Sequence, residues 1–103
     1  EVLARLPITG QTLSVIKKAL EGVVSGPRGT AREAFEGATF TAAGKTGTSE
    51  TGQEEPHAWF AGYTPLESPQ VAIAVILEHA GEGSKEAAPV FRQMAEAFFA
   101  RQA

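Results

Sequence analysis

The chain has 103 residues, of which 43% are hydrophobic and 20% are charged, and its formal net charge is −3. This balance is typical of one small folded domain or of part of a larger one, and it argues against intrinsic disorder and against a nucleic-acid-binding surface. The sequence contains no Cys, no Asp and no Asn, so a disulfide, a thiolate metal site and a Ser-His-Asp triad are excluded within it.

The first predicted element is a helix over residues 11–24, followed by a short helical turn over residues 31–35. Apolar residues recur at helical spacing along the first helix, at Leu13, Ile16, Leu20 and Val23. Gly26 is expected to end this helix in a left-handed conformation, because Pro27 blocks its continuation. Thr30 is expected to cap the short turn.

Three strands are predicted next, over residues of about 39–48, 57–63 and 71–78. The third strand is apolar on both of its faces, so we expect it to be covered on both sides. Trp59 and Phe60 are neighbours in the second strand and therefore point to opposite faces of the sheet. Packing is the expected role of both side chains.

A second long helix is predicted over residues of about 85–101, and Pro89 fits only its first turn. Four residues share its apolar face, namely Phe91, Met94, Ala95 and Phe98. The elements together predict an α+β fold, a three-stranded antiparallel sheet with flanking N- and C-terminal helices. Two helices cover such a sheet only partly, so we expect residues 1–103 to be a fragment of a larger domain and only marginally stable alone.

The chemically most informative segment is Gly44-Lys45-Thr46-Gly47-Thr48. Its Gly-Lys-Thr string is similar to the end of a phosphate-binding P-loop, which would need another Gly at position 39. That position is occupied by Thr39, the residues after the segment are typical of a turn rather than a helix, and the sequence has no Asp to bind magnesium. Nucleotide binding is therefore not expected.

The same segment suits the recognition of a peptide that ends in a carboxylate. Lys45 supplies an ammonium group, and Thr46 and Thr48 supply hydroxyl donors. Gly47 has no side chain, so a substrate backbone can lie close and pair with the strand, and the next backbone N–H can point at a developing oxyanion. Strict alternation places Lys45 on one face and both Thr residues on the other, so only a ligand that lies along the strand edge meets all three.

Lys-Thr-Gly is a signature of the penicillin-recognising serine enzymes, and its surroundings extend the resemblance. After a polar loop comes His57-Ala58-Trp59-Phe60-Ala61-Gly62-Tyr63-Thr64-Pro65, and later come Gly83-Ser84 and Ala87-Ala88-Pro89-Val90-Phe91. Upstream lie Val24, Gly26-Pro27 and Gly29-Thr30-Ala31. From about residue 12 the chain closely resembles the C-terminal end of the class B penicillin-binding proteins, and the HAWF-G-Y pattern is most similar to the elongation-type penicillin-binding protein 2.

This resemblance implies a fragment of the penicillin-binding and serine β-lactamase-like transpeptidase fold. Lys45 would hold positive potential beside the nucleophile, and Thr46 and Thr48 would bind the carboxylate of a D-Ala-D-Ala stem peptide or of a β-lactam. Gly47 would keep the strand open, and the backbone N–H of Thr48 would form half of the oxyanion hole. The implied activity is D,D-transpeptidation, which cross-links peptidoglycan through a serine acyl-enzyme.

The resemblance also implies that the reaction uses no metal and no cofactor. It further implies that the partner of this chain is the remainder of the transpeptidase domain. The parent protein would be anchored in the cytoplasmic membrane, with this domain in the cell envelope on the extracytoplasmic side. No stretch of the sequence itself approaches the roughly 18 apolar residues of a membrane span. No signal peptide is visible in it either.

Two further signatures of the family concern its nucleophile. Ser-x-Asn is absent, since the sequence has no Asn, and Ser-x-x-Lys occurs only as Ser14-Val15-Ile16-Lys17. Ser14 lies only 31 residues before Lys45 (45 − 14), whereas the nucleophile of the family lies far upstream of this strand. We therefore interpret the match as a chance one and expect the nucleophile to lie outside residues 1–103, so that the chain alone forms no adduct with penicillin.

Two alternatives to transpeptidation stay open. A D,D-carboxypeptidase or a β-lactamase shares the Lys-Thr-Gly strand, and the products formed by the complete protein would separate these activities. A non-catalytic module that senses β-lactams or wall peptides, or a scaffold piece, is the second alternative, and upstream sequence would decide it. His57 lies near the strand, and its expected role is structural hydrogen bonding.

Overall fold

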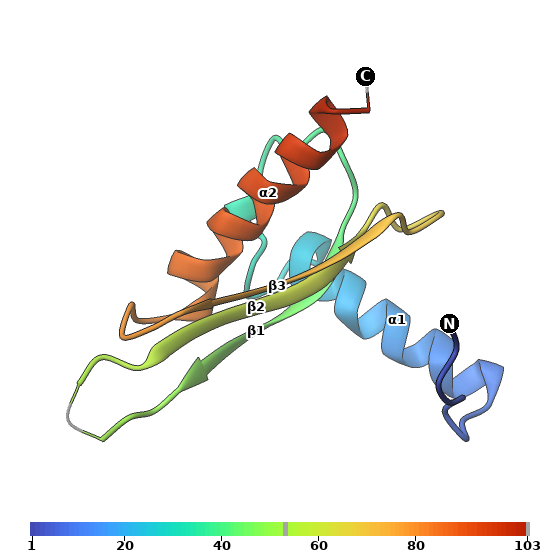
Figure 1. The fold of residues 1–103 in the computed structure, drawn as a ribbon, viewed down its shortest axis with the longest axis horizontal. Coiled ribbons are helices and arrows are strands. Elements are labelled where there is room, and N and C mark those ends of the chain that lie inside the picture. Colours follow the sequence, from blue (N-terminus) through green and yellow to red (C-terminus); the bar gives the residue numbers. More distant parts are fainter. Residues whose placement is uncertain (53, 103) are drawn as a thin grey trace.

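The computed structural model describes residues 1–52 and 54–102, which form one antiparallel sheet with two long helices (Figure 1). In chain order these are α1 (Gly10–Ser25), a 3₁₀ turn (Glu33–Phe35), β1 (Ala43–Ser49), β2 (His57–Thr64), β3 (Val71–Leu77), a π-helical turn (Gly83–Ala87) and α2 (Ala88–Ala100). The three strands have the spatial order β1-β2-β3, and each is antiparallel to its neighbour. The predicted α+β class and sheet are confirmed.

The residues before β1 do not join the sheet, although the sequence predicted a strand from residue 39. Thr41 uses its hydroxyl instead to hold the connection between β2 and β3. It accepts a hydrogen bond from the backbone N–H of Leu66 at 2.9 Å and donates one to Glu67 at 3.2 Å. Thr-rich sequence is typical of strands, but here the side-chain bonds replace ladder bonds.

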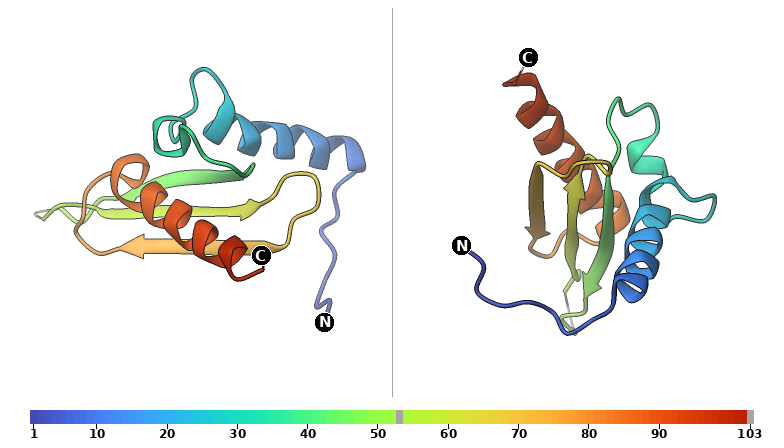
Figure 2. Two further views of the ribbon diagram at one scale, coloured as in Figure 1. Left: turned by 90° about the horizontal axis from the view of Figure 1, so that it is seen from above. Right: turned by 90° about the vertical axis from the view of Figure 1, so that its right-hand side faces the viewer.

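The register of the sheet fixes which side chains share a face. Thr46 lies opposite Phe60, and Phe60 lies opposite Val75. Directly opposed residues point to the same side, so these three share one face. Their neighbours Lys45 and Trp59 point to the other face. The helix α2 packs against β2 and β3, and Figure 2 shows it crossing one face of the sheet.

Aromatic rings fill the space between the sheet and α2. Phe60 and Phe91 are fully buried, with ring centroids 4.7 Å apart, and the ring of Phe35 lies 5.8 Å from each. Gly44 makes room for this cluster, because a Cβ atom there would lie 2.7 Å from the Cζ atom of Phe60. Each buried Phe contributes roughly 1.5–3 kcal/mol to the free energy of folding, so this cluster is the main source of stability.

The opposite face of the sheet is uncovered by the described residues. Trp59 is 40% exposed and Ile76 is 52% exposed, whereas Val75 of β3, on the face that carries Phe60, is 6% exposed. The expectation that two helices cover the sheet only partly is confirmed, and the described residues do not supply the second cover expected for β3. The strand lies at an edge of the sheet rather than in its centre, and α2 reaches only one face.

The helix α1 flanks the β1 edge and extends beyond the sheet with its N-terminal half (Figures 1 and 2). Thr9 caps its start by accepting a hydrogen bond from the N–H of Thr12 at 3.1 Å. Leu13 and Ile16 belong to the apolar pattern that predicted this helix, and they are 41% and 43% exposed. Only the C-terminal half of the helix packs against the rest of the chain, where Val24 is buried.

The end of α1 differs from the prediction in its backbone conformation. Gly26 has φ −72°, so the expected left-handed cap is wrong. The glycine is required for a steric reason instead, because a Cβ atom there would lie 2.6 Å from the carbonyl oxygen of Gly22. None of the helices in the described ranges is long and apolar enough to cross a membrane.

The helix α2 begins at Ala88, directly after the π-helical turn, which places Pro89 in its first turn as predicted. Phe91 and Ala95 on the predicted apolar face are buried, whereas Met94 on the same face is 47% exposed. Phe99 packs instead on Phe40, at a centroid distance of 5.6 Å. The buried stripe of the helix is rotated toward the residues that precede β1.

Candidate active-site strand

The strand β1 carries the Lys-Thr-Gly-Thr segment at one edge of the sheet. No other described strand pairs with its outer side, although the C-terminal end of α1 and the connection after it lie against the first part of the strand. A groove of about 380 Å³ runs beside it, lined by Lys45, Thr46, Gly47, Thr48, Ser49, Trp59 and Ala61. All four residues that the sequence singled out as site residues therefore line one concave surface.

The side chains alternate between the two faces of β1, as the sequence predicted. Lys45 points to the uncovered face, whereas Thr46 and Thr48 point to the face that carries Phe60. The ammonium group of Lys45 is exposed and donates a hydrogen bond to the carbonyl oxygen of Thr46 at 2.9 Å. Lys45 takes part in none of the ion pairs between described residues, so its charge is available to an anion.

The hydroxyl group of Thr46 has a partner that the sequence did not indicate. Its Oγ1 atom lies 3.0 Å from Oγ1 of Thr30, in the connection after α1. The connection is held in place by the N–H of Ala31, which donates to the carbonyl oxygen of Val23 at 3.0 Å. The predicted capping role of Thr30 is wrong, because the 3₁₀ turn begins after Arg32 without a side-chain cap. Spacing in the sequence gives no sign of this contact.

Gly47 leaves the groove open next to Trp59. A Cβ atom at Gly47 would lie 3.3 Å from the Cβ atom of Trp59 and would enter the groove. The indole Nε1 of Trp59 donates a hydrogen bond to the hydroxyl of Ser49 at 2.6 Å, which fixes the ring along the strand. Packing was the predicted role of Trp59, but in this chain the ring forms an exposed wall of the groove.

Thr48 is linked to the turn that precedes α2. The backbone N–H of Gly83 donates to the Oγ1 atom of Thr48 at 3.4 Å. The sequence indicated Gly83 and Ser84 as part of a turn over residues 81–84 and as part of the resemblance, without any sign of this contact. Their turn packs against β1 and β2 on the face that carries Phe60.

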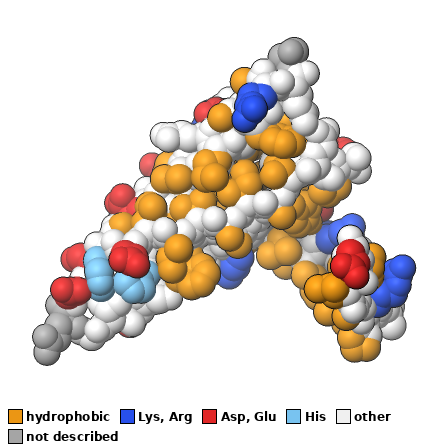
Figure 3. Space-filling view, in the orientation of Figure 1, with side chains coloured by type: hydrophobic (Ala, Val, Ile, Leu, Met, Phe, Trp, Pro, Cys, Tyr) orange, Lys and Arg blue, Asp and Glu red, His pale blue; other side chains and the backbone are white. Residues whose placement is uncertain are grey.

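The two histidines lie together beyond the end of the groove, with ring centroids 4.5 Å apart, and Figure 3 shows them beside acidic side chains. The backbone N–H of His79 donates to Nδ1 of His57 at 3.0 Å. The ring of His79 lies 2.9 Å from the carbonyl oxygen of Glu55 and 2.9 Å from the carboxylate of Glu54. These contacts tie the chain before β2 to the chain after β3, which is the structural role expected of His57.

Ser14 lies in the exposed N-terminal half of α1, as does Lys17. Neither residue lines the groove beside β1. The C-terminal end of α1 does approach Lys45, and the two enclose a second cavity of about 440 Å³, whose α1 residues begin at Ala19. The Ser-x-x-Lys string and the Lys-Thr-Gly segment therefore do not share a cavity.

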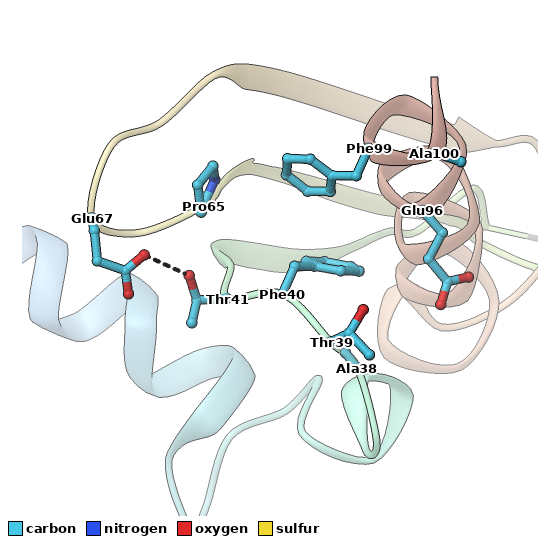
Figure 4. Close-up of a pocket in the computed structure, with 9 residues that line it drawn as sticks. All are labelled: Ala38, Thr39, Phe40, Thr41, Pro65, Glu67, Glu96, Phe99 and Ala100. Carbon is cyan, nitrogen blue, oxygen red and sulfur yellow. Dashed lines mark hydrogen bonds between the residues drawn. The ribbon is translucent and has the colours of Figure 1, made fainter. Parts of the chain in front are cut away.

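A larger cavity of about 760 Å³ lies away from the segment, between the end of α2 and the residues before β1 (Figure 4). Phe40 and Phe99 line its interior, and Glu67 and Glu96 lie on opposite sides of it. Glu67 already accepts a hydrogen bond from Thr41, and Glu96 one from Arg92. The cavity contains no Lys, Ser or His side chain, so the groove beside β1 is the better candidate for acyl-transfer chemistry.

The chain is similar to several known proteins. The family profile of the penicillin binding protein transpeptidase domain matches residues 1–96. The peptidoglycan D,D-transpeptidase MrdA of Haemophilus influenzae is 36% identical over 93 residues, which are 76% of this chain but 14% of that protein. The peptidoglycan D,D-transpeptidase PbpA of Mycobacterium tuberculosis is 39% identical over 64 residues.

Solved structures show the same fold. The crystal structure of Pseudomonas aeruginosa PBP2 in complex with WCK 5153 superposes with a TM-score of 0.81 at 35% identity, covering 94% of this chain and 20% of that one. The imipenem acyl-enzyme of penicillin-binding protein A from M. tuberculosis superposes with a TM-score of 0.73 at 28% identity, covering 93% and 21%. The chain thus spans a small part of each relative, and it belongs to the penicillin-binding protein transpeptidase family.

Proposed function

We propose that β1 is the substrate-binding wall of a peptidoglycan D,D-transpeptidase, and that this chain acts as part of a longer polypeptide that supplies the nucleophile. The observation that carries the proposal is the open edge of β1, where Lys45, Thr46, Gly47 and Thr48 line one groove. An open edge pairs with an extended peptide through its backbone, and the groove receives the peptide's side groups. The relatives named D,D-transpeptidases support the choice of reaction.

The substrate in this proposal is a stem peptide that ends in D-Ala-D-Ala, and a β-lactam takes the same place. Its terminal carboxylate accepts hydrogen bonds from the hydroxyl groups of Thr46 and Thr48 and lies in the field of Lys45. Hydrogen bonds to a charged group contribute roughly 1.5–3 kcal/mol, so they set the position of the peptide terminus. Thr30 holds the hydroxyl of Thr46 in place, which lowers the cost of ordering it.

The reaction begins when the serine hydroxyl attacks the carbonyl carbon of the penultimate D-Ala and gives its proton to a base. The carbonyl oxygen then carries a negative charge, and the backbone N–H of Thr48 donates to it. The bond to the terminal D-Ala breaks, a proton passes to the leaving amine, and an ester to the enzyme remains. The amino group of a second stem peptide attacks this ester, the serine takes back a proton, and a cross-link has formed.

This sequence of steps is an acyl transfer without redox change, so it needs no cofactor from the protein. Attack by water in place of the second amine would give a D,D-carboxypeptidase, or a β-lactamase when the substrate is a β-lactam. The proposal places the reaction in the cell envelope, outside the cytoplasmic membrane, because peptidoglycan lies there. Cross-linked dimers as the main product of the complete protein would support transpeptidation, and free D-Ala without dimers would contradict it.

Labelling with a fluorescent penicillin tests the division of the active site between this chain and the rest of the protein. The complete protein should become covalently labelled, and the isolated 103-residue chain should not. The variant Ser14→Ala of the complete protein should keep the label. A stable adduct on Ser14 of the isolated chain would overturn the proposal that the nucleophile lies elsewhere.

A further inference from the structure

Gly83 occupies a crowded position between β3 and α2. It is buried, and it lies on the backbones of β1 and β2 at the point where Gly47 and Trp59 face each other. A Cβ atom at Gly83 would lie 2.9 Å from the backbone N of Gly47 and closer still to the carbonyl oxygens of Gly47 and Trp59. The atoms that it would meet are backbone atoms, which cannot turn away as a flexible side chain does.

The requirement for glycine at this position is steric rather than conformational. The glycines with positive φ among the described residues are Gly37, Gly52 and Gly81, and Gly83 is not one of them. An L-amino acid can therefore adopt the backbone angles of Gly83. A substitution there acts by pushing on its neighbours, and the nearest neighbours in β1 belong to Gly47.

The carbonyl group of Gly47 and the N–H of Thr48 belong to one planar peptide unit and point in opposite directions within it. A push on this carbonyl oxygen therefore turns or shifts the N–H as well. Gly83 also contacts the next residue of β1, since its own N–H donates a hydrogen bond to the hydroxyl of Thr48. The turn before α2 thus fixes the peptide unit on which the proposed oxyanion hole depends.

We propose that Gly83 is a positioning residue for the backbone N–H of Thr48. Because Gly83 has no side chain, it packs directly on the Gly47–Thr48 peptide unit and so sets the direction of this N–H. This inference rests on the proposed function, because it assigns a task to that N–H. The inference also predicts that a substitution at Gly83 affects the acylation step more than the binding of the carboxylate. Of the three groups that the proposed function assigns to the carboxylate, only the Thr48 hydroxyl contacts Gly83, whereas the Thr46 hydroxyl and the Lys45 ammonium have no contact with it among those described, so the docking of the carboxylate depends less on Gly83 than the direction of the N–H does.

The test is the acylation of the complete protein by a fluorescent penicillin, with the non-covalent dissociation constant and the acylation rate constant measured separately. Removal of a whole oxyanion donor slows a reaction about 10²–10³-fold, so a displaced donor in Gly83→Ala should slow acylation by at least about 10-fold. The dissociation constant should change by less than about 3-fold. Gly22→Ala is the matched control, because nothing lies within 4 Å of its added Cβ atom, and both constants should stay as in the wild type.

Rate constants are expressed per molecule that becomes labelled at the end point, so unfolded molecules do not enter them. A crystal structure of Gly83→Ala should show the Gly47–Thr48 peptide displaced. An unchanged acylation rate, an equal loss in both constants, or a slower rate with an undisplaced peptide would each overturn the inference. A wild-type protein that penicillin does not acylate would overturn the proposed function itself, and the role of Gly83 with it.

Discussion

The two parts of β1 differ in what their residues contact. Its first residues, Ala43 and Gly44, are buried, and Gly44 lies under the ring of Phe60. From Lys45 onward the strand borders a groove, and no described strand pairs with its outer side. One short strand therefore serves two tasks. Packing in the core fixes its first residues, and its later residues remain accessible to a ligand.

The largest expected effect concerns the buried part. Phe60→Ala should lower the free energy of unfolding by about 3–5 kcal/mol, because the ring is fully buried and a cavity remains. Because the isolated chain is expected to be only marginally stable, the variant should be unfolded even without urea, which circular dichroism measures. Ile76→Ala on the uncovered face of the isolated chain is the control and should change stability by less than about 0.5 kcal/mol. Equal losses in both variants would show that the two faces do not differ.

The next effect concerns the open part. Lys45→Ala should leave stability within about 0.5 kcal/mol of the wild type, since the side chain is exposed and has no ion pair among the described residues. It should lower the efficiency of penicillin acylation of the complete protein about 10- to 100-fold, the value of a lost hydrogen bond to a charged group. Lys17→Ala should leave acylation unchanged. A Lys17→Ala variant that loses more activity than Lys45→Ala would refute the assignment.

Substitution by Ala should mainly lower stability at Gly44 and mainly lower acylation at Gly47. Gly44→Ala should cost about 1–3 kcal/mol of stability, because the new methyl group meets the Phe60 ring and the carbonyl oxygen of Ala61. Gly47→Ala should cost less than about 1 kcal/mol, because its methyl group meets only Trp59 at 3.3 Å. The methyl group at Gly47 enters the groove, however, so acylation of the complete protein should fall more than in Gly44→Ala, at equal amounts of folded protein. The reverse order would contradict the division of the strand.

The smallest effect concerns the contact between Thr30 and Thr46. Thr30→Val keeps the shape of the side chain and removes its hydroxyl group, so acylation should become about 3- to 10-fold less efficient, as expected for one neutral hydrogen bond. Thr39→Val removes a hydroxyl group away from the groove and should have no such effect. Acylation kinetics of both variants of the complete protein measure the difference. Identical kinetics for Thr30→Val and wild type would show that the contact does not support binding.

Local patterns in the sequence predicted the elements and the site strand because both depend on residues close in the chain. Alternation along β1 placed Lys45 and the two Thr residues on opposite faces, and the structure agrees. The apolar sequence of β3 was misleading, because it indicates burial without telling which polypeptide provides the cover. The described residues cover only the face on which Val75 is 6% exposed, and on the other face Ile76 is 52% exposed.

Contacts between segments that are distant in the sequence produce no local sequence pattern, so they could not be predicted. Thr30 and Thr46 meet across 16 positions, and Gly83 and Thr48 across 35. Thr30 was assigned to a helix cap, because hydroxyl residues before a helical turn usually serve there. Gly83 was interpreted as part of a turn and of the family resemblance, since a glycine required by close packing looks in the sequence like a glycine required by a turn.

A crystal structure of the complete protein acylated by penicillin tests the central claim most directly, namely that the open edge of β1 receives the peptide terminus. The account predicts the penicillin carboxylate within about 3.2 Å of the Thr46 hydroxyl, and the acyl carbonyl oxygen at a similar distance from the N–H of Thr48. An adduct seated elsewhere, with the groove beside β1 empty, would contradict it.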